Sequence, residues 1–473
     1  MPAKPAQPDG THAHAGVGSV PGPHDAAMLH CDQNDFGGSD GSAIGVPKAR
    51  RERSTTIPHA AESPRLARHP CPSPRPHWSA LDGFRGIAIL MVITVHFWAH
   101  SAPGGVGFPV AILAGDHRFA LEWVFLSGSL GVTIFFALSG FLLWYPFAKA
   151  LAEGSPIPSP TRFYVRRLRR IMPAFLCFAC AYLLLVYTVG PNAAALPISS
   201  DSIAANLFFM APVVCLFSGN AVPDLVPGTW SLTPEMWFYL LLPMIALLST
   251  AIHRKLHWLL IVAMLALGTW YRHYVVGDPR PIAHLNLRAC IHVFAWGMAA
   301  ANLVIACPRI VSRPIFAYLG AALIVFGAWW RGALFGYLDT YFLVGLGAAL
   351  IIMSVTGAES KIRALCDAPL LRFIGKISFS LFLCNLIVVW YVFGPLWKAF
   401  HIAPGPARFA VLVVLGFPVA IGLATLGYEW IERPWLERTT GPQPFRLWRR
   451  GLAVAGGIRA TPLFLRVAGR RKN

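Results

Sequence analysis

Long apolar runs separated by short polar connections dominate the chain from about residue 82 to residue 431. Most runs are close to the roughly 20 residues that a helix needs to cross the hydrocarbon core of a bilayer. Lipid offers no hydrogen-bond partners to a backbone, and this favours helices for such runs. We therefore expect an all-α, polytopic membrane protein with about ten transmembrane helices. The predicted spans are residues 82–100, 124–147, 171–190, 232–250, 257–276, 287–306, 314–330, 337–356, 374–395 and 408–431.

One further apolar stretch, residues 203–218, is short and is interrupted by Pro212. Its length favours a re-entrant or interfacial segment over a full span. Counting it as a span would invert the topology of every later loop. That inversion would spoil the agreement between loop charge and predicted sidedness.

The charges of the connections predict that both termini are cytoplasmic. With the N-terminus inside, the outer connection at 191–231 contains no Lys or Arg. The cytoplasmic connections then hold Arg162, Arg166, Arg167, Arg169, Arg170, Arg254, Lys255, Arg309, Arg313, Lys361, Arg363 and Arg372. Three arginines in the next outer connection are exceptions: Arg272, Arg280 and Arg288.

Composition supports the membrane class, with 56% hydrophobic and 13% charged residues. A net charge of +19 would suggest nucleic acid in a soluble protein. Here the charge lies in the tails and short connections, so it indicates topology and no nucleic-acid partner is expected. We predict a disordered tail at residues 1–78, a membrane domain at 79–435 and a basic cytoplasmic tail at 436–473.

The spacing of Cys177 and Cys180 is that of a metal-binding pair, but no second pair follows. A buried structural role is the better prediction, and no metal site is expected.

The first predicted span carries Arg85 near one end and His96 eleven residues later. At about 100° and 1.5 Å per residue, the two side chains return nearly to one face, roughly 16 Å apart along the axis. A histidine inside a bilayer is a candidate functional residue because polar groups are costly there. The alternative is an interfacial arginine anchor and a histidine bonded to a neighbouring helix.

Three other stretches carry candidate chemistry. Arg167 and Arg170 share a helix face and suit a phosphate-rich ligand, although a topology signal fits their position equally well. Ser139 and Gly140 would allow another helix or a thin ligand to approach the backbone closely. Glu235 is an acid at the outer end of a span, where it caps the helix or has a specific partner.

Six stretches together are distinctive: LDGFRG followed by His96, GVTIFFALSGFLL, RFYVRRLRRIMP, WSLTPEMWFYLLLP, IGKISFSLFL and YEWIERPW. Their order and wording, from Leu81 to Trp435, resemble the acyltransferase-3 family of integral membrane O-acyltransferases. Arg85 with His96 matches the Arg-x10-His motif of that family, and Arg167 with Arg170 its Arg-x-x-Arg motif. The Trp-Ser-Leu-x-x-Glu motif is matched by Trp230, Ser231, Leu232 and Glu235. One departure is Asn385, which stands where the family often has histidine.

The resemblance implies transfer of an acyl group, commonly acetyl, from cytoplasmic acyl-CoA to a hydroxyl of a carbohydrate or glycolipid at the outer face of a bacterial inner membrane. Acyl-CoA would be a co-substrate, with no bound cofactor. The expected catalytic residues are His96 as general base, Arg85, and Glu235, which would orient His96 or position the acceptor.

Arg167 and Arg170 are the expected donor-binding residues, because acyl-CoA carries several phosphates. The expected acceptor or supporting residues are Trp230, Ser231, Tyr239 and Ser139. The rival interpretation is a proton-coupled transporter, since intramembrane His, Arg and Glu also build proton relays. Transporters often show two matching halves, and no internal repeat is visible here.

Overall fold

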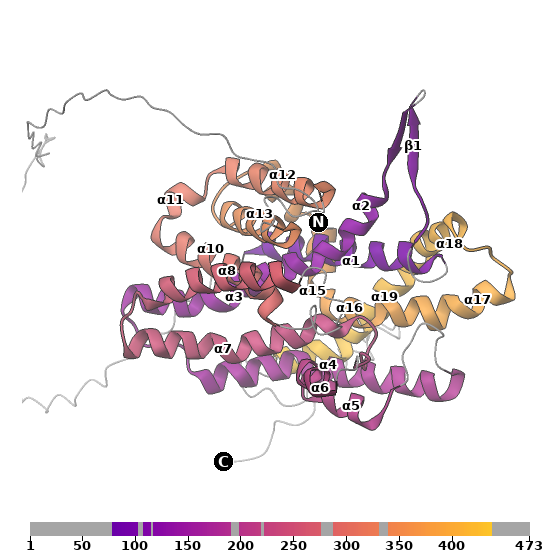
Figure 1. Cartoon of the computed structure of the whole chain (residues 1–473), viewed down its shortest axis with the longest axis horizontal. Helices are drawn as coiled ribbons and strands as arrows, with labels where there is room; N and C mark the ends of the chain where they lie inside the picture. The colour runs from indigo at the N-terminus through magenta and orange to yellow at the C-terminus, as the bar shows by residue number, and fades with distance from the viewer. Residues whose placement is uncertain are drawn as a thin grey trace, which may run out of the picture. The chain divides into compact units, whose positions relative to one another are not determined.

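The computed structural model describes residues 78–102, 107–114, 117–190, 198–218, 222–275, 287–330 and 339–437. These residues are almost entirely helical, as Figure 1 shows. The exception is an antiparallel hairpin of β1 (Ala111–Ala114) and β2 (His117–Ala120), with Ala111 paired to Ala120. The two predicted tails lie almost wholly outside the described residues.

Seven helical segments in the described part of the chain are long and apolar enough to cross a membrane. They are α1 (Ser79–His100), α2 (Glu122–Leu126) with α3 (Gly131–Glu153), α4 (Pro160–Val189), α7 (Leu232–Ala251) with its preceding turn, α10 (Leu287–Ala306), α16 (Ser378–Ile387) with α17 (Gly394–Ala399), and α18 (Pro406–Val411) through α19 (Phe417–Gly427) to α20 (Arg433–Glu437). The other three predicted spans fall on α8 (Leu256–Val275), α12 (Pro314–Trp330) and α13 (Thr340–Val355).

Short helices complete the described chain: α5 (Ser200–Leu207), α6 (Ala211–Ser218), α11 (Pro308–Val311), α14 (Lys361–Cys366) and α15 (Pro369–Lys376). The stretch predicted to be re-entrant or interfacial is divided between α5 and α6. The chain breaks at Phe209, whose φ of 56° cannot continue a helix. Neither piece is long enough to span a bilayer.

The third span begins earlier than predicted, and this matters for the site. Ser159 accepts a hydrogen bond from the Arg162 amide at 3.5 Å, and Pro160 occupies the first helical turn. Both features favour a helix start. The arginines expected in a cytoplasmic loop therefore lie on a helical extension of α4, where their positions are fixed relative to the membrane helices.

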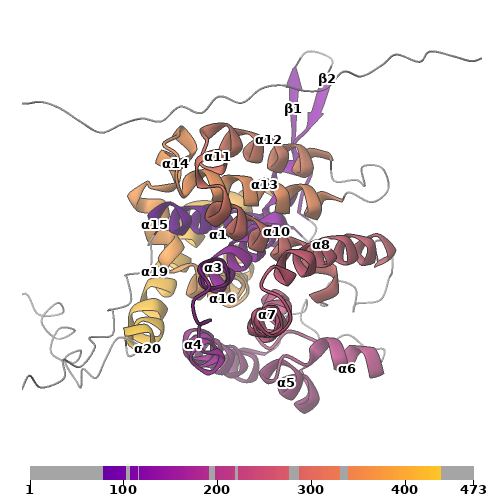
Figure 2. The same cartoon turned by 90° about the vertical axis from the view of Figure 1, so that its left-hand side faces the viewer.

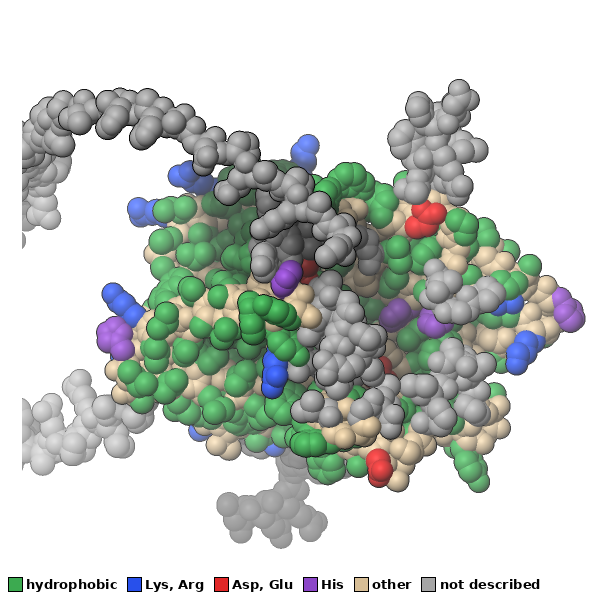
Figure 3. Space-filling model, viewed as in Figure 1, with side chains coloured by type: hydrophobic (Ala, Val, Ile, Leu, Met, Phe, Trp, Pro, Cys, Tyr) green, Lys and Arg blue, Asp and Glu red, His purple; other side chains and the backbone are tan. Residues whose placement is uncertain are grey.

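In both views, α1, α3 and α16 lie between two groups of helices (Figures 1 and 2). One group contains α4 to α7 and the other α10 to α13. Figure 3 shows that apolar side chains dominate the outward face in view. Large apolar residues are exposed on α4, α7, α8 and α12, as a lipid-facing surface requires.

Glycines let the central helices approach closely. A Cβ added at Gly140 of α3 would lie 2.2 Å from the Phe294 carbonyl oxygen, and one at Gly297 of α10 would lie 2.0 Å from that of Ala137. The expectation of close helix approach at Ser139–Gly140 is confirmed.

One exception to the charge pattern has a partner, and one sequence interpretation is wrong. Arg272 Nε donates to Asp339 Oδ2 at 2.9 Å, and its guanidinium stacks 4.0 Å from the Tyr341 ring centre. Cys177 and Cys180 are exposed instead of buried, since they lie on the outward side of α4.

Candidate active site

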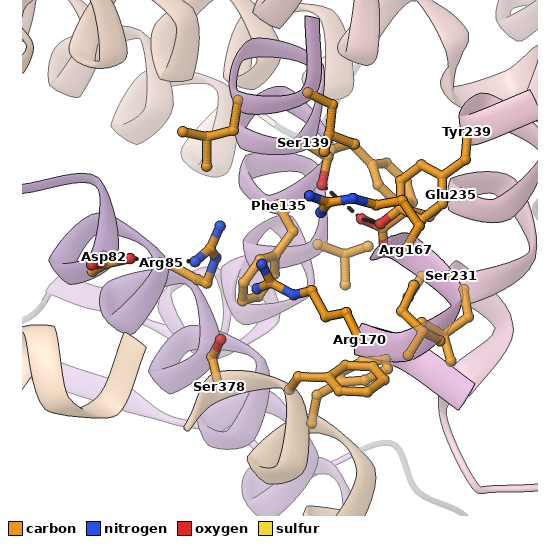
Figure 4. A pocket seen from close by; sticks show the side chains of 18 residues that line it. Asp82, Arg85, Phe135, Ser139, Arg167, Arg170, Ser231, Glu235, Tyr239 and Ser378 are labelled. Atoms are coloured by element: carbon orange, nitrogen blue, oxygen red, sulfur yellow. Dashed lines mark hydrogen bonds and ion pairs between the residues drawn. The ribbon is translucent and has the colours of Figure 1, made fainter. Parts of the chain in front are cut away.

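A cavity of about 460 Å³ lies between α1, α3, α4, α7 and α16 (Figure 4). Seven of the nine predicted site residues line it: Arg85, Ser139, Arg167, Arg170, Ser231, Glu235 and Tyr239. Sequence reasoning missed two polar lining residues, Asp82 and Ser378. Both belong to the quoted motifs LDGFRG and IGKISFSLFL, so the motifs themselves were the available signal.

Three guanidinium groups point into this cavity. Arg85 extends from α1 and faces Arg170, which enters with Arg167 from α4 (Figure 4). Arg85 Nη1 lies 3.4 Å from Asp82 Oδ1. Arg162 and Arg169 are exposed, so the basic stretch on α4 contains both cavity and surface arginines.

One glycine from each of the motifs LDGFRG and IGKISFSLFL explains how Arg85 reaches the cavity. A Cβ at Gly86 would lie 2.2 Å from the Leu371 carbonyl oxygen, and one at Gly375 would lie 1.8 Å from that of Asp82. The backbones of α1 and α15 are therefore in direct contact. This contact fixes one side of α1 and leaves Arg85 free to enter the cavity.

Glu235 is held by two hydroxyl groups. Its Oε1 accepts hydrogen bonds from Ser139 Oγ and from Tyr239 OH, each at 2.7 Å. Pro234 lies in the first turn of α7, and this places Glu235 at the amino end of the helix.

His96 does not line the cavity. It lies on α1 eleven residues beyond Arg85, which corresponds to roughly 16 Å along the helix axis. Its Nδ1 is 2.6 Å from Asn385 Oδ1, so Asn385, and not Glu235, is the residue that contacts the imidazole. Asn385 lies seven residues after Ser378 on α16, two helical turns along the same face.

Trp230 also stands outside the cavity lining. Its backbone N–H donates to Asp224 Oδ2 at 3.3 Å, at the turn that leads into α7. In that turn, Gly228 has a φ of 80°, and a Cβ there would lie 3.6 Å from His96 Cε1. The turn therefore connects the His96 region with Ser231 in the cavity wall.

Within the described residues, no group of three His, Cys, Asp or Glu side chains could hold a metal ion. The polar groups of the cavity are three arginines, two carboxylates and hydroxyls, a set that suits an organic anion better than a cation.

The profile of the acyltransferase-3 family, described as an acyltransferase domain, matches residues 78–425. The chain belongs to this family. The match includes every residue of the cavity and the His96–Asn385 pair.

Three curated relatives place this family member among bacterial proteins. The O-acetyltransferase OatA of Staphylococcus aureus is 25% identical over 382 residues, 76% of this chain and 57% of OatA. YrhL of Bacillus subtilis, provisionally named a peptidoglycan O-acetyltransferase, is 26% identical over 398 residues, 77% of this chain and 55% of YrhL.

The exopolysaccharide production protein ExoZ of Rhizobium meliloti is 27% identical over 330 residues, 66% of this chain and 91% of ExoZ. The chain thus spans 57% of the length of OatA, and most of ExoZ. No solved structure matches the chain.

Proposed function

We propose that this acyltransferase-3 family member moves an acyl group, in the first instance acetyl, from cytoplasmic acyl-CoA to a hydroxyl of a carbohydrate or glycolipid at the outer face of the membrane. One observation carries the proposal. Three arginines converge in a cavity at one end of α1, and the same helix presents His96 about 16 Å further along. The names of OatA and ExoZ, which refer to O-acetyl transfer and exopolysaccharide, support the reaction class and the acceptor class.

The donor would bind by its phosphates. Arg85, Arg167 and Arg170 present planar forks from two helices, and such forks match phosphate oxygens in pairs. The cavity volume of about 460 Å³ is in the range of small-molecule sites. The long, thin pantetheine arm of the donor would then extend from the arginines towards His96.

The chemical step requires one base. His96 takes the proton of the acceptor hydroxyl as its oxygen attacks the acyl carbonyl carbon. The carbon–sulfur bond breaks, and the CoA thiolate takes the proton back from the imidazolium. The products are the acyl ester and free CoA thiol, so atoms and charges balance. Glu235, held by Ser139 and Tyr239, would position the acceptor or the thioester.

Topology completes the proposal. Ten crossings with both termini in the cytoplasm would put the arginine-bearing start of α4 at the inner surface. Residues 79–435 would form the membrane acyltransferase domain, in a bacterial inner membrane. The lack of Lys and Arg between residues 191 and 231 supports an outer position for that connection.

The test is the rate at which purified protein in lipid nanodiscs releases CoA from acetyl-CoA and acetylates an oligosaccharide of N-acetylglucosamine. His96→Ala and His96→Gln should each lower the rate by about a hundredfold to ten-thousandfold, the usual cost of losing a general base. His257→Gln is the matched control, because His257 contacts the Arg254 carbonyl oxygen and does not line the cavity.

Near-normal turnover by His96→Gln would show that His96 is structural. Wild-type protein that translocates protons without releasing CoA would favour a transporter instead.

A further inference from the structure

The amide of Asn385 can take only one orientation. Asn385 is buried, and its Nδ2 lies 3.2 Å from the Leu381 carbonyl oxygen and 2.6 Å from that of Phe382. Carbonyl oxygens accept hydrogen bonds and cannot donate them. The amide nitrogen must therefore face these two carbonyls, and the amide oxygen must face His96.

This orientation determines which nitrogen of His96 carries hydrogen. The Asn385 oxygen is an acceptor, so Nδ1 of His96, at 2.6 Å, must be the donor. A neutral imidazole has a single N–H, and Nε2 is then left with its lone pair.

That lone pair is also accessible. Nε2 of His96 makes no hydrogen bond to any described residue. The His96 side chain is only half-buried, in contrast to the fully buried His292. The ring edge that carries Nε2 can therefore meet a substrate hydroxyl.

We infer that Asn385 is a positioning residue that fixes the Nδ1–H tautomer of His96 and so presents Nε2 as the base towards the acceptor hydroxyl. The catalytic consequence rests on the proposed function, whereas the tautomer does not. Nε2 takes the hydroxyl proton and later returns it to the CoA thiolate. Throughout, Nδ1–H stays bonded to Asn385, whose neutral amide takes up no proton.

Asn385 thus supplies what a carboxylate or a second histidine could supply at the same place. His100 lies one turn further along α1, and Asp224 binds the turn that carries Gly228. No hydrogen bond of the described residues joins either of them to the imidazole.

Two substitutions distinguish a role of Asn385 in positioning His96 from a role in packing α16 alone. Asn385→Leu removes the acceptor and both backbone contacts. Asn385→Asp keeps an acceptor for Nδ1–H but loses the donors to Leu381 and Phe382. If Asn385 only stabilises α16, both variants should behave alike. If it positions His96, Asn385→Asp should retain far more activity than Asn385→Leu.

Asn302→Leu is a matched control. Asn302 is another buried membrane asparagine whose Oδ1 accepts from a ring N–H, that of Trp144 at 2.9 Å, but it lies away from the cavity lining. This variant should leave the kcat and KM of transfer from acetyl-CoA unchanged.

The direct readout is the nitrogen-15 NMR spectrum of protein labelled at its 16 histidines, recorded at about pH 9, where an ordinary imidazole is neutral. The His96 signals are assigned by difference from His96→Gln. Wild type and Asn385→Asp should show hydrogen on Nδ1, and Asn385→Leu should show a mixture of tautomers. The kcat of Asn385→Leu should fall by about tenfold to ten-thousandfold, with the KM for acetyl-CoA unchanged.

Hydrogen on Nε2 in the wild type would overturn the inference, as would equal losses in the Leu and Asp variants. A wild type with hydrogen on Nδ1 that releases no CoA from acetyl-CoA would support the tautomer and overturn the proposed function.

Discussion

Replacing Arg170 with alanine should weaken donor binding without weakening the fold. Arg170 faces Arg85 across the cavity, and Arg167 lies one turn away on α4 (Figure 4). The lining carries three cations against two carboxylates, Asp82 and Glu235. Because like charges repel in a partly buried site, loss of one cation removes an unfavourable interaction from the empty protein. Stability should therefore be unchanged or slightly raised.

The magnitude follows from the contact that is lost. A hydrogen bond to a charged group contributes about 1.5–3 kcal/mol net. At about 1.4 kcal/mol per tenfold, the Kd for acetyl-CoA should rise by about tenfold to 150-fold. Arg170→Lys should recover only part of the affinity, since an ammonium group keeps the charge and loses the planar fork.

The assay is equilibrium binding of acetyl-CoA and of S-acetylpantetheine, which lacks phosphate, to protein in nanodiscs. Arg169→Ala is the matched control, because Arg169 is exposed on the same helix and carries the same charge. Only Arg170→Ala should lose affinity, and only for acetyl-CoA. An equal loss in Arg169→Ala, or an equal loss for the phosphate-free donor, would refute phosphate docking in this cavity.

Three further predictions follow from the packing and hydrogen bonds. In Gly86→Ala the new Cβ would lie 2.2 Å from the Leu371 carbonyl oxygen, against at least 3.4 Å for ordinary contact, so overpacking should cost about 1–3 kcal/mol and lower the Tm. Gly422→Ala is the control, because a Cβ at Gly422 meets open space and should leave the Tm unchanged. Equal Tm values for the two variants would contradict the close contact at Gly86. Ser139→Ala removes one donor to Glu235 and should slow transfer about tenfold with unchanged acetyl-CoA affinity. Complete loss, together with acetyl trapped on Ser139 in the wild type, would instead make Ser139 a nucleophile. Burial raises the pKa of Asp224 to about 7 although backbone N–H groups oppose this. Between the unfolded pKa of about 4 and pH 7 the folded protein holds the extra proton, so unfolding free energy should fall as pH rises through this window. The Tm difference between pH 5 and pH 8 should be smaller in Asp224→Asn than in the wild type. An equal difference in the two proteins would show that the Asp224 carboxyl does not cause the pH dependence of stability.

The positions of the helices were predictable because they depend on local sequence. Over its described residues, each of the ten predicted ranges coincides with one or more helical segments, since a run of apolar residues in lipid has no other way to satisfy its backbone. The start of α4 was not predicted, because hydropathy identifies only the apolar part of a helix and the first turns of α4 are polar. Ser159 and Pro160 were its available signals.

The membership of the site was more predictable than its contacts. Arg85, Arg167 and Glu235 come from three helices and meet in one cavity. This differs from the expectation that the arginines lie at the inner surface and Glu235 at the outer end of its span, because hydropathy does not show how deep the start of α7 lies. The partner of His96 was not predictable, because a rotation of one residue turns a helix face by about 100°. Helix packing alone decides that Asn385 contacts His96 and that Glu235 contacts Ser139.

The YEWIERPW motif has a packing role that its sequence does not reveal. The helix continues past Arg433 to Glu437, and Glu432 is buried. Its Oε1 accepts from the Ser380 amide at 2.9 Å and from the Ser380 hydroxyl at 2.5 Å. Through these hydrogen bonds Glu432 joins the last span to α16. Hydropathy gives no indication of such a contact between helices.

This link explains how the end of the membrane domain can affect the candidate chemistry. The helix α16 contributes Ser378 to the arginine cavity and Asn385 to His96, so its position along its axis sets both contacts. Ser380 lies between them and is held by Glu432, in the stretch just before the described helix ends at Glu437. A buried carboxylate that loses its donors is costly, so the pairing resists sliding of α16. The motifs at the two ends of the domain are therefore parts of one arrangement, in which Glu432 fixes α16, α16 carries Asn385, and Asn385 orients His96 on α1.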